Sequence, residues 1–197
     1  MYWYKQVFNK TVNPLFHYGE RGLTLLFFVG VFVSLLPSCK PDNLQNGATP
    51  KHFDIKGYFE AEAARLKKRN PLITKTVTHN GFTEVKKLNI TNWNAELGLF
   101  IQSDINKPAW RDSYNTDSSA TSIIYKAKTS DLKTQLVIIT KNEGKIKWIM
   151  IYNTGNNKLY HTREKLSYFP DSLYMIEKVQ KVRLLNENSY LIKGKLN

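Results

Sequence analysis

The stretch Lys-Ile-Lys-Trp-Ile-Met-Ile-Tyr-Asn, residues 145–153, decides the fold of this chain. Because side chains alternate between the two faces of a strand, Ile146, Trp148, Met150 and Tyr152 would share one face. The residues between them include two more isoleucines, so the second face is apolar as well. A strand that is apolar on both faces is typical of the middle of a sheet. We therefore expect helices on one side of it and, on the other, a covered surface or the lining of a cavity.

Further strand-like segments lie on both sides of this stretch. Short turn signals separate them, such as Asn-Glu-Gly at residues 142–144 and Thr-Gly-Asn-Asn at residues 154–157. Connections this short join neighbouring antiparallel strands, whereas parallel strands need long crossovers. The sequence therefore predicts an antiparallel meander with strands at residues 122–128, 135–141, 145–153, 158–164, 174–184 and 190–195.

Two amphipathic helices are predicted before the meander. Residues 54–68 place apolar side chains at helical spacing on one face, where Glu62 is the single charged residue. The second helix would begin at a cap formed by Thr91 or Asn92 and end at Pro108.

A hairpin is predicted between these helices, because segments 72–78 and 82–90 flank Asn80-Gly81, a dipeptide typical of tight hairpin turns. Residues 109–120 are predicted to form a polar loop. Together the elements predict an α+β fold in which two N-terminal helices pack on an antiparallel meander sheet. A partly closed β-barrel is the alternative.

The only cysteine of the chain, Cys39, follows an uncharged apolar run at residues 23–36. This run has 14 residues, whereas a helix that crosses a membrane needs about 20. Its length instead suits the core of a signal peptide, typically about 7–15 residues. Leu36-Pro37-Ser38-Cys39 resembles the lipobox of bacterial lipoproteins, although the proline departs from the usual second position. The resemblance implies cleavage before the cysteine and a diacylglycerol on its thiol.

This interpretation divides the chain into three parts. Residues 1–38 would be a lipoprotein signal peptide, residues 39–51 a lipidated flexible linker and residues 52–197 one domain. Lys40, not an aspartate, follows the cysteine, and by resemblance to the sorting rule of Gram-negative lipoproteins this favours the outer membrane. The membrane is thus an expected partner, held through the lipid anchor.

The chain is strongly basic, with a formal charge of +13. A basic protein of the cell envelope is attracted to phospholipid head groups and to other anionic polymers of that compartment. Nucleic acid is not an expected partner, because export separates the protein from it.

Common signatures of catalytic and metal sites are missing from the sequence. It contains no Gly-x-Ser-x-Gly, His-Glu-x-x-His, Cys-x-x-Cys or phosphate-binding loop. His52, His79 and His161 lie far apart along the chain, so a shared metal site is not expected. We therefore expect no cofactor and no metal, and we assign no catalytic residue.

The segment at residues 103–114 is unusual, because it gathers Trp110, Arg111, Asp112 and Tyr114 in a short stretch. Aromatic faces beside a guanidinium and carboxylates can form a ligand or partner loop. The same residues can instead anchor a packed loop, with the tryptophan buried and the arginine paired to Asp104 or to its neighbouring aspartate. The anchor is the favoured interpretation.

The segment at residues 166–174, Leu-Ser-Tyr-Phe-Pro-Asp-Ser-Leu-Tyr, is predicted to cap the sheet with a Pro-Asp turn and aromatic side chains. Together with residues 70–77, 80–81 and 103–114, it resembles a family of uncharacterised lipoproteins from Bacteroidota-type bacteria. The resemblance implies export and an α+β domain. It implies no activity, so no functional residue follows from it.

These observations favour a non-enzymatic binding or accessory module, tethered to the envelope membrane, whose partner is a protein, a lipid or a glycan. The partner would bind on a concave sheet face or on the Trp110 loop. One alternative is an envelope hydrolase that uses two carboxylates as acid and base. Another alternative is a β-barrel that carries an apolar ligand. The carboxylates available to the hydrolase are Asp104, Asp112, Glu164 and Asp171.

Overall fold

A computed structural model describes residues 50–183 and 185–197. Cys39, the signal peptide at residues 1–38 and nearly all of the linker lie outside these residues, so their predictions stay predictions. Within the described ranges, no helix is both long enough and apolar enough to span a membrane.

The described residues form a few helices and nine strands. The helices are α2 (Ile55–Arg69), α3 (Trp93–Glu96) and α4 (Gly98–Ile101), with a short 3-10 helix, η1 (Pro108–Trp110). The strands are β1 (Leu72–His79), β2 (Phe82–Asn89), β3 (Tyr114–Ser118), β4 (Ser122–Ala127), β5 (Thr134–Asn142), β6 (Lys145–Asn156), β7 (Tyr160–Phe169), β8 (Leu173–Val182) and β9 (Asn188–Leu196).

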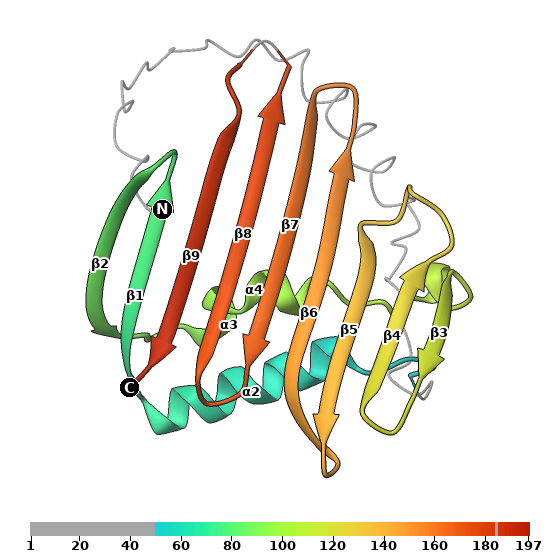
Figure 1. Ribbon diagram of the computed structural model, residues 1–197, viewed down its shortest axis with the longest axis horizontal. Helices are drawn as coiled ribbons and strands as arrows, with labels where there is room; N and C mark the ends of the chain where they lie inside the picture. The colour runs from blue at the N-terminus through green and yellow to red at the C-terminus, as the bar shows by residue number, and fades with distance from the viewer. Residues whose placement is uncertain (1–49, 184) are drawn as a thin grey trace, which may run out of the picture. The chain divides into compact units, whose positions relative to one another are not determined.

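All nine strands belong to one antiparallel sheet in the order β2-β1-β9-β8-β7-β6-β5-β4-β3 (Figure 1). The strands from β4 to β9 form the predicted meander, since each pairs with the next along the chain, and β3 adds an unpredicted strand beside β4. The N-terminal hairpin joins beside β9, where Ile73 of β1 lies opposite Leu196. The first and last strands of this order do not pair with each other, so the sheet is open and the alternative of a partly closed barrel is wrong.

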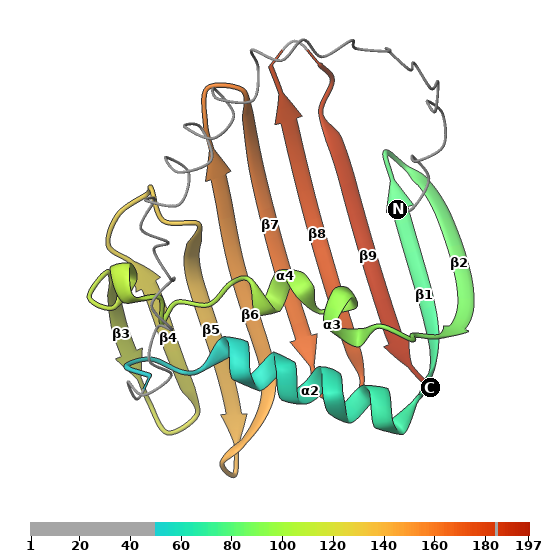
Figure 2. The same ribbon diagram turned by 180° about the vertical axis from the view of Figure 1, so that it is seen from behind.

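Residues 145–153, predicted to lie in the middle of the sheet, form most of β6, which is an interior strand between β5 and β7. Helices α2, α3 and α4 lie over one face of the sheet (Figure 2). Ile149 and Ile151 of β6 point toward this face and are fully buried. Phe59 of α2 packs edge-on against Tyr168 of β7, with 5.1 Å between the ring centroids. The core therefore lies between the helices and one face of the sheet.

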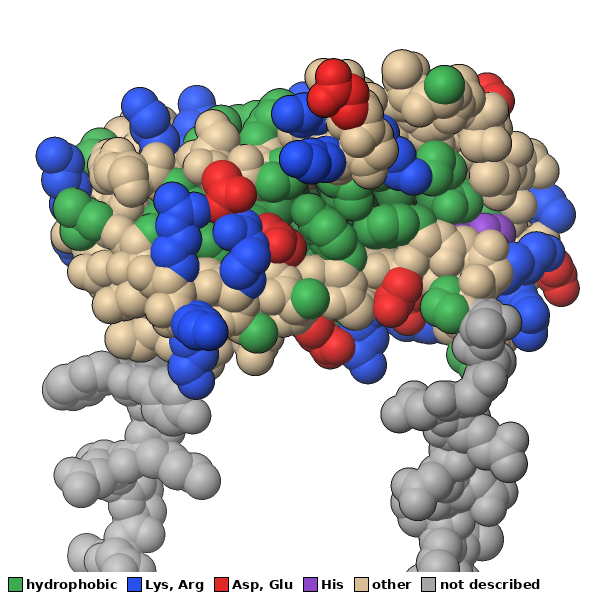
Figure 3. All heavy atoms as spheres, turned by 90° about the horizontal axis from the view of Figure 1, so that it is seen from below, with side chains coloured by type: hydrophobic (Ala, Val, Ile, Leu, Met, Phe, Trp, Pro, Cys, Tyr) green, Lys and Arg blue, Asp and Glu red, His purple; other side chains and the backbone are tan. Residues whose placement is uncertain are grey.

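Figure 3 shows the molecule from below, with apolar side chains gathered in a central band and charged side chains around it. On the side of α2 that faces the sheet, Ile55, Phe59, Ala63 and Leu66 are all buried. The helix begins where the Asp54 carboxylate accepts a hydrogen bond from the Gly57 amide. It ends where Asn70 adopts a left-handed conformation. The first predicted helix is confirmed at both ends, within about two residues.

The second predicted helix is wrong as a continuous element. Asn92 does cap its start, accepting from the Ala95 amide, but the chain then divides into two single turns, α3 and α4. Helical geometry ends at Ile101, well before Pro108. Shortly after that end, the Ser103 hydroxyl donates back to the Leu99 carbonyl, a bond that competes with helix continuation.

Two strand predictions also needed correction. The expected polar loop at residues 109–120 contains β3, whose residues after Tyr114 are exposed and polar. The strand predicted at residues 158–164 continues through Phe169, because Leu166 and Tyr168 pack into the core. The turn that follows Phe169 is confirmed, with Asp171 at a φ of 58°.

Candidate functional site

On the face of the sheet that carries no helix among the described residues, apolar side chains gather over strands β4 to β8, and the ion pair of Lys165 and Glu177 interrupts them beside Tyr152. The pairing register aligns Ile138, Met150, Ser167 and Met175 as direct neighbours in one row across it. The adjacent rows contribute aromatic side chains. We call this surface the open-face patch, and it consists of Ile124, Leu136, Ile138, Trp148, Met150, Tyr152, Phe169, Leu173 and Met175, all of them half-buried.

A stacked aromatic pair forms one border of the open-face patch. The rings of Trp148 and Phe169 lie 6.0 Å apart between centroids with an angle of 16° between their planes. Beside them, Met150 and Met175 supply flexible, polarisable side chains that adapt to different surfaces. Aromatic residues and methionine are enriched at the centres of protein interfaces. The patch therefore has the composition of a contact surface.

Lysines flank the open-face patch on both sides. Lys193 and Lys195 of β9 lie directly opposite Met175 and Leu173, and both are exposed. On the far side, Lys126 of β4 lies opposite Leu136 and is also exposed. An apolar centre with a basic border complements a partner that has an apolar contact surrounded by acidic groups. The face is thus partly an apolar surface and partly a lysine-covered one.

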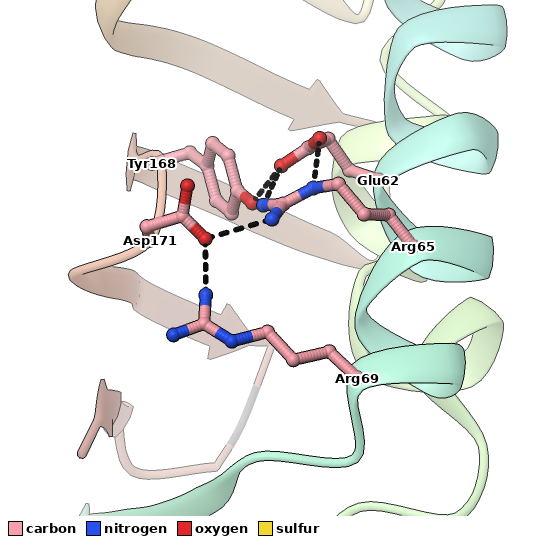
Figure 4. Close-up of polar contacts among 5 residues, drawn as sticks. All are labelled: Glu62, Arg65, Arg69, Tyr168 and Asp171. Atoms are coloured by element: carbon pink, nitrogen blue, oxygen red, sulfur yellow. Dashed lines mark hydrogen bonds and ion pairs between the residues drawn. The ribbon is translucent and has the colours of Figure 1, made fainter.

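A polar cluster fixes helix α2 to the other face of the sheet (Figure 4). The Tyr168 hydroxyl donates to the Glu62 carboxylate over 2.5 Å, and the Arg65 guanidinium donates to both oxygens of the same carboxylate. Arg65 also donates to Asp171 over 2.7 Å, and Arg69 donates to the same Asp171 oxygen. The one charged residue on the apolar face of α2 is therefore a structural contact between helix and sheet.

A second tyrosine repeats this arrangement one strand further along. Tyr174 is the direct cross-strand neighbour of Tyr168. Its hydroxyl donates to Glu96 over 2.5 Å, and Lys75 of β1 forms an ion pair with Glu96 at 2.7 Å. Burial is the main cause that raises the pKa of both tyrosines far above the ordinary value, and the neighbouring glutamates raise it further. Both hydroxyls therefore stay protonated and serve as donors that hold the helices.

The candidate loop of the sequence analysis does not form one cluster. Trp110 is partly buried against the core, and the Lys107 ammonium lies 4.2 Å from the centre of its ring. Asp112 is exposed and pairs with Lys51, which holds the pKa of its carboxyl below the usual range. Tyr114 is buried, and its hydroxyl donates to the Thr134 carbonyl over 2.9 Å.

Arg111 takes part in this loop through its backbone. Its carbonyl oxygen lies 3.0 Å from Nε2 of the buried His52, an interaction that joins the loop to the start of the described chain. The Asn106 side chain adds to this contact. Its Oδ1 accepts a hydrogen bond from the His52 backbone amide, and its Nδ2 donates to the Phe53 carbonyl over 3.1 Å. These contacts agree with a packed loop, but the expected pairing of Arg111 with Asp104 or Asp112 is not among the ion pairs of the described residues. Sequence reasoning missed Asn106, because no local pattern relates it to residues more than 50 positions away.

The four carboxylates of the hydrolase alternative each have their own partners. The Asp104 carboxylate accepts a hydrogen bond from the Asn106 backbone amide. The Asp112 carboxylate accepts one from Lys51, and the Asp171 carboxylate accepts from two arginines. Glu164 is buried on the helix-covered face, where it accepts from Asn153 Nδ2 at 3.3 Å and pairs with Lys178 at 3.1 Å.

The three histidines of the described residues lie in different surroundings. His52 is buried in the loop anchor, His79 stacks on Tyr190 at 4.3 Å, and His161 is exposed near the end of the sheet. Within residues 50–183 and 185–197, no group of three or more potential metal ligands comes together.

The residues that the sequence analysis missed are those of the open-face patch outside β6. Alternation along residues 146–152 indicated an apolar second face for that strand. The register that places Phe169, Met175 and Ile138 beside it depends on pairings that a single sequence does not specify.

Comparisons of the chain with protein-family models, with curated proteins and with solved structures find no match, so its function has to be argued from these residues alone.

Proposed function

We propose that this protein is a non-enzymatic binding module of a bacterial cell envelope, tethered to the outer membrane through a lipid on Cys39, and that the open-face patch binds a partner protein. The observation that carries the binding proposal is the open-face patch on strands β4 to β8, which no described helix covers (Figure 1). Contiguous exposed apolar surface on a folded protein commonly marks an interaction site.

The chemistry of the patch favours a protein partner. Met150, Met175 and the Trp148–Phe169 pair would form the apolar centre of the interface, and the flanking lysines would form its polar rim. The partner would therefore present an apolar surface with acidic residues around it. A flat aromatic surface also suits a glycan ring, and affinity capture distinguishes a bound glycan from a bound protein.

The hydrolase and carrier alternatives have less support. Each of the four candidate carboxylates is engaged by its own cations or amides, and no observation favours a shared catalytic pair. A carrier of apolar ligands needs an enclosed cavity, whereas the patch lies on an open sheet.

Two variants of equal charge change test the binding surface. Lys193→Glu reverses a charge beside the patch, and Lys68→Glu reverses an exposed charge on α2. Affinity capture of the full chain from detergent-solubilised envelopes should recover a partner with the parent and with Lys68→Glu. Capture should fall at least about 5-fold with Lys193→Glu, the equivalent of roughly 1 kcal/mol. Equal capture by all three proteins, or a captured glycan without protein, would contradict the proposal.

The tether has its own test. Cys39→Ser should move the protein out of the membrane fraction, and the intact mass of the parent should include acyl groups that the variant lacks. Two or more acyl chains anchor a protein firmly, so the difference should be nearly complete. Membrane association that does not change in the variant, with an unmodified parent mass, would contradict lipidation but would leave the binding surface untouched.

A further inference from the structure

Four connections of the sheet lie at the end that is uppermost in Figure 1, and three of them expose large apolar side chains. These three are the β1–β2 turn, the β6–β7 turn and the β8–β9 loop, and we call them the tip edge. They share this end because β1, β6 and β8 run in the same direction through the antiparallel order. Backbone hydrogen bonds join them, since the Arg183 amide donates to the Leu159 carbonyl and the Asn80 amide to the Ser189 carbonyl.

The tip edge exposes apolar side chains that nothing in the described fold buries. Phe82 is 84% exposed, Leu159 is 67% exposed and Leu185 is 65% exposed. Tyr160, beside Leu159, is 40% exposed. Single exposed apolar residues are ordinary on protein surfaces. Four large ones on adjoining turns are not ordinary, and such a group points to an apolar or interfacial partner.

Basic side chains surround these apolar tips. A shallow pocket of about 410 Å³ between the β6–β7 turn and the β8–β9 loop is lined by Lys158, His161, Lys181 and Arg183, together with Leu159, Val182 and Leu185. No carboxylate is among these lining residues. Glu187 is the acidic residue of the β8–β9 loop. The pocket thus offers up to three permanent cations beside exposed leucines.

The turns at the opposite end of the sheet have a different character. The β5–β6 turn contains Glu143, and the β7–β8 turn contains Asp171, which two arginines bind. Neither turn exposes a large apolar side chain among the described residues. These two turns therefore lack the exposed leucines and phenylalanine of the tip edge.

We propose that the tip edge docks on the surface of an anionic phospholipid bilayer. Leu159, Leu185 and Phe82 would enter the interface between head groups and acyl chains, while Lys158, Lys181 and Arg183 contact lipid phosphates. Apolar side chains with adjacent lysines and arginines bind membrane surfaces in this way, and their long side chains reach the head groups while the apolar groups insert. This contact is separate from the open-face patch, so it goes beyond the proposed function and neither depends on the other.

A fluorescent label at single positions tests the docking in the full chain. Because Cys39 is the only cysteine, Cys39→Ser gives a background in which one new cysteine carries the label. Leu185→Cys reports on the tip edge, and Ser172→Cys reports on the opposite end. Each labelled protein, carrying an environment-sensitive dye, is mixed with vesicles of phosphatidylcholine alone, with vesicles that also contain phosphatidylglycerol, and with inorganic phosphate.

The expected result is a blue shift and a rise in emission at position 185 with phosphatidylglycerol vesicles, and no change at position 172. Replacing Lys158, Lys181 and Arg183 by glutamine should weaken the response on the order of 100-fold in vesicle concentration, since each cation contributes about a factor of five. No response at position 185, an equal response at both positions, or the same response to inorganic phosphate without vesicles would overturn the proposal.

Discussion

Gly194 shows at the scale of one residue how closely the tyrosine contacts of this sheet are fitted. It is the cross-strand neighbour of Tyr174, and the tyrosine ring lies across its backbone. A Cβ at this position would lie 2.1 Å from the ring, far inside contact distance. Only a residue without a side chain permits the tyrosine to reach Glu96 and hold the helices.

Gly194→Ala is therefore expected to destabilise the protein, because the ring must leave its place or the strand must bend. The expected loss is about 1–3 kcal/mol in the free energy of unfolding, measured by chemical denaturation. Gly155→Ala is the matched control, since its Cβ would meet only ordinary contacts at 3.8 Å. Equal stability of the two variants would show that Tyr174 does not occupy this position.

Because buried tyrosines have raised pKa values, the stability of the folded protein is expected to depend on pH in the alkaline range. Burial raises the pKa of Tyr114 to about 12, above the ordinary value of 10.0. The unfolded chain then loses this proton at a lower pH than the folded protein does. The stabilising contribution of the protonated Tyr114 to the free energy of unfolding is fully present below pH 10. It is lost as the pH rises from about 10 to about 12.

Phenolate absorbance of the intact protein is expected to rise in two stages. The exposed tyrosines should ionise first, and the buried ones only as the protein unfolds. Tyr114→Phe should reduce the second stage and make the alkaline loss of stability less steep. It should also cost about 1 kcal/mol at neutral pH, because the Thr134 carbonyl loses its donor. A single stage near the ordinary pKa would contradict the burial of these hydroxyls.

Among the helices and strands, the sequence predicted the ones that depend only on residues close together along the chain. Helix α2 follows from an unbroken apolar period with a cap at Asp54. The helix expected after Asn92 was wrong as one element, because the chain divides at Leu97 into α3 and α4 and the Ser103 hydroxyl bonds back to Leu99 just after Ile101. Strand β3 was missed, since its exposed polar residues form a strand only through pairing with β4.

Glu62 joins α2 to β7 through its hydrogen bond with Tyr168, so the two side chains should contribute to stability together. A double-mutant cycle with Glu62→Gln and Tyr168→Phe should measure a coupling of about 1–2 kcal/mol, as expected for a hydrogen bond to a charged, largely buried group. The matched cycle uses Lys56→Ala and Glu60→Ala, an exposed pair within α2 at 3.9 Å.

The matched cycle should give about 0.5 kcal/mol or less. Both couplings are read from denaturation midpoints with the same slope. Equal couplings in the two cycles would mean that the tyrosine does not hold the helix.

At the scale of the whole molecule, the meander and its position after the helices followed from turn spacing, and the order of the strands confirms it. The binding surface did not follow in the same way. Tyr168 and Phe169 are adjacent in sequence, yet they lie on opposite faces, one in the core and one on the open-face patch. Only the register of neighbouring strands decides which aromatic joins which surface.

The most direct test of the central claim is site-specific photocrosslinking in intact cells, with a photoreactive residue in place of Met150 on the open-face patch. The matched position is Glu60, exposed on the outer side of α2. We expect one discrete protein adduct from position 150 and none from position 60, and Lys193→Glu should abolish that adduct. The absence of an adduct at position 150, or the same adduct at both positions, would contradict the claim that this face of the sheet binds a partner.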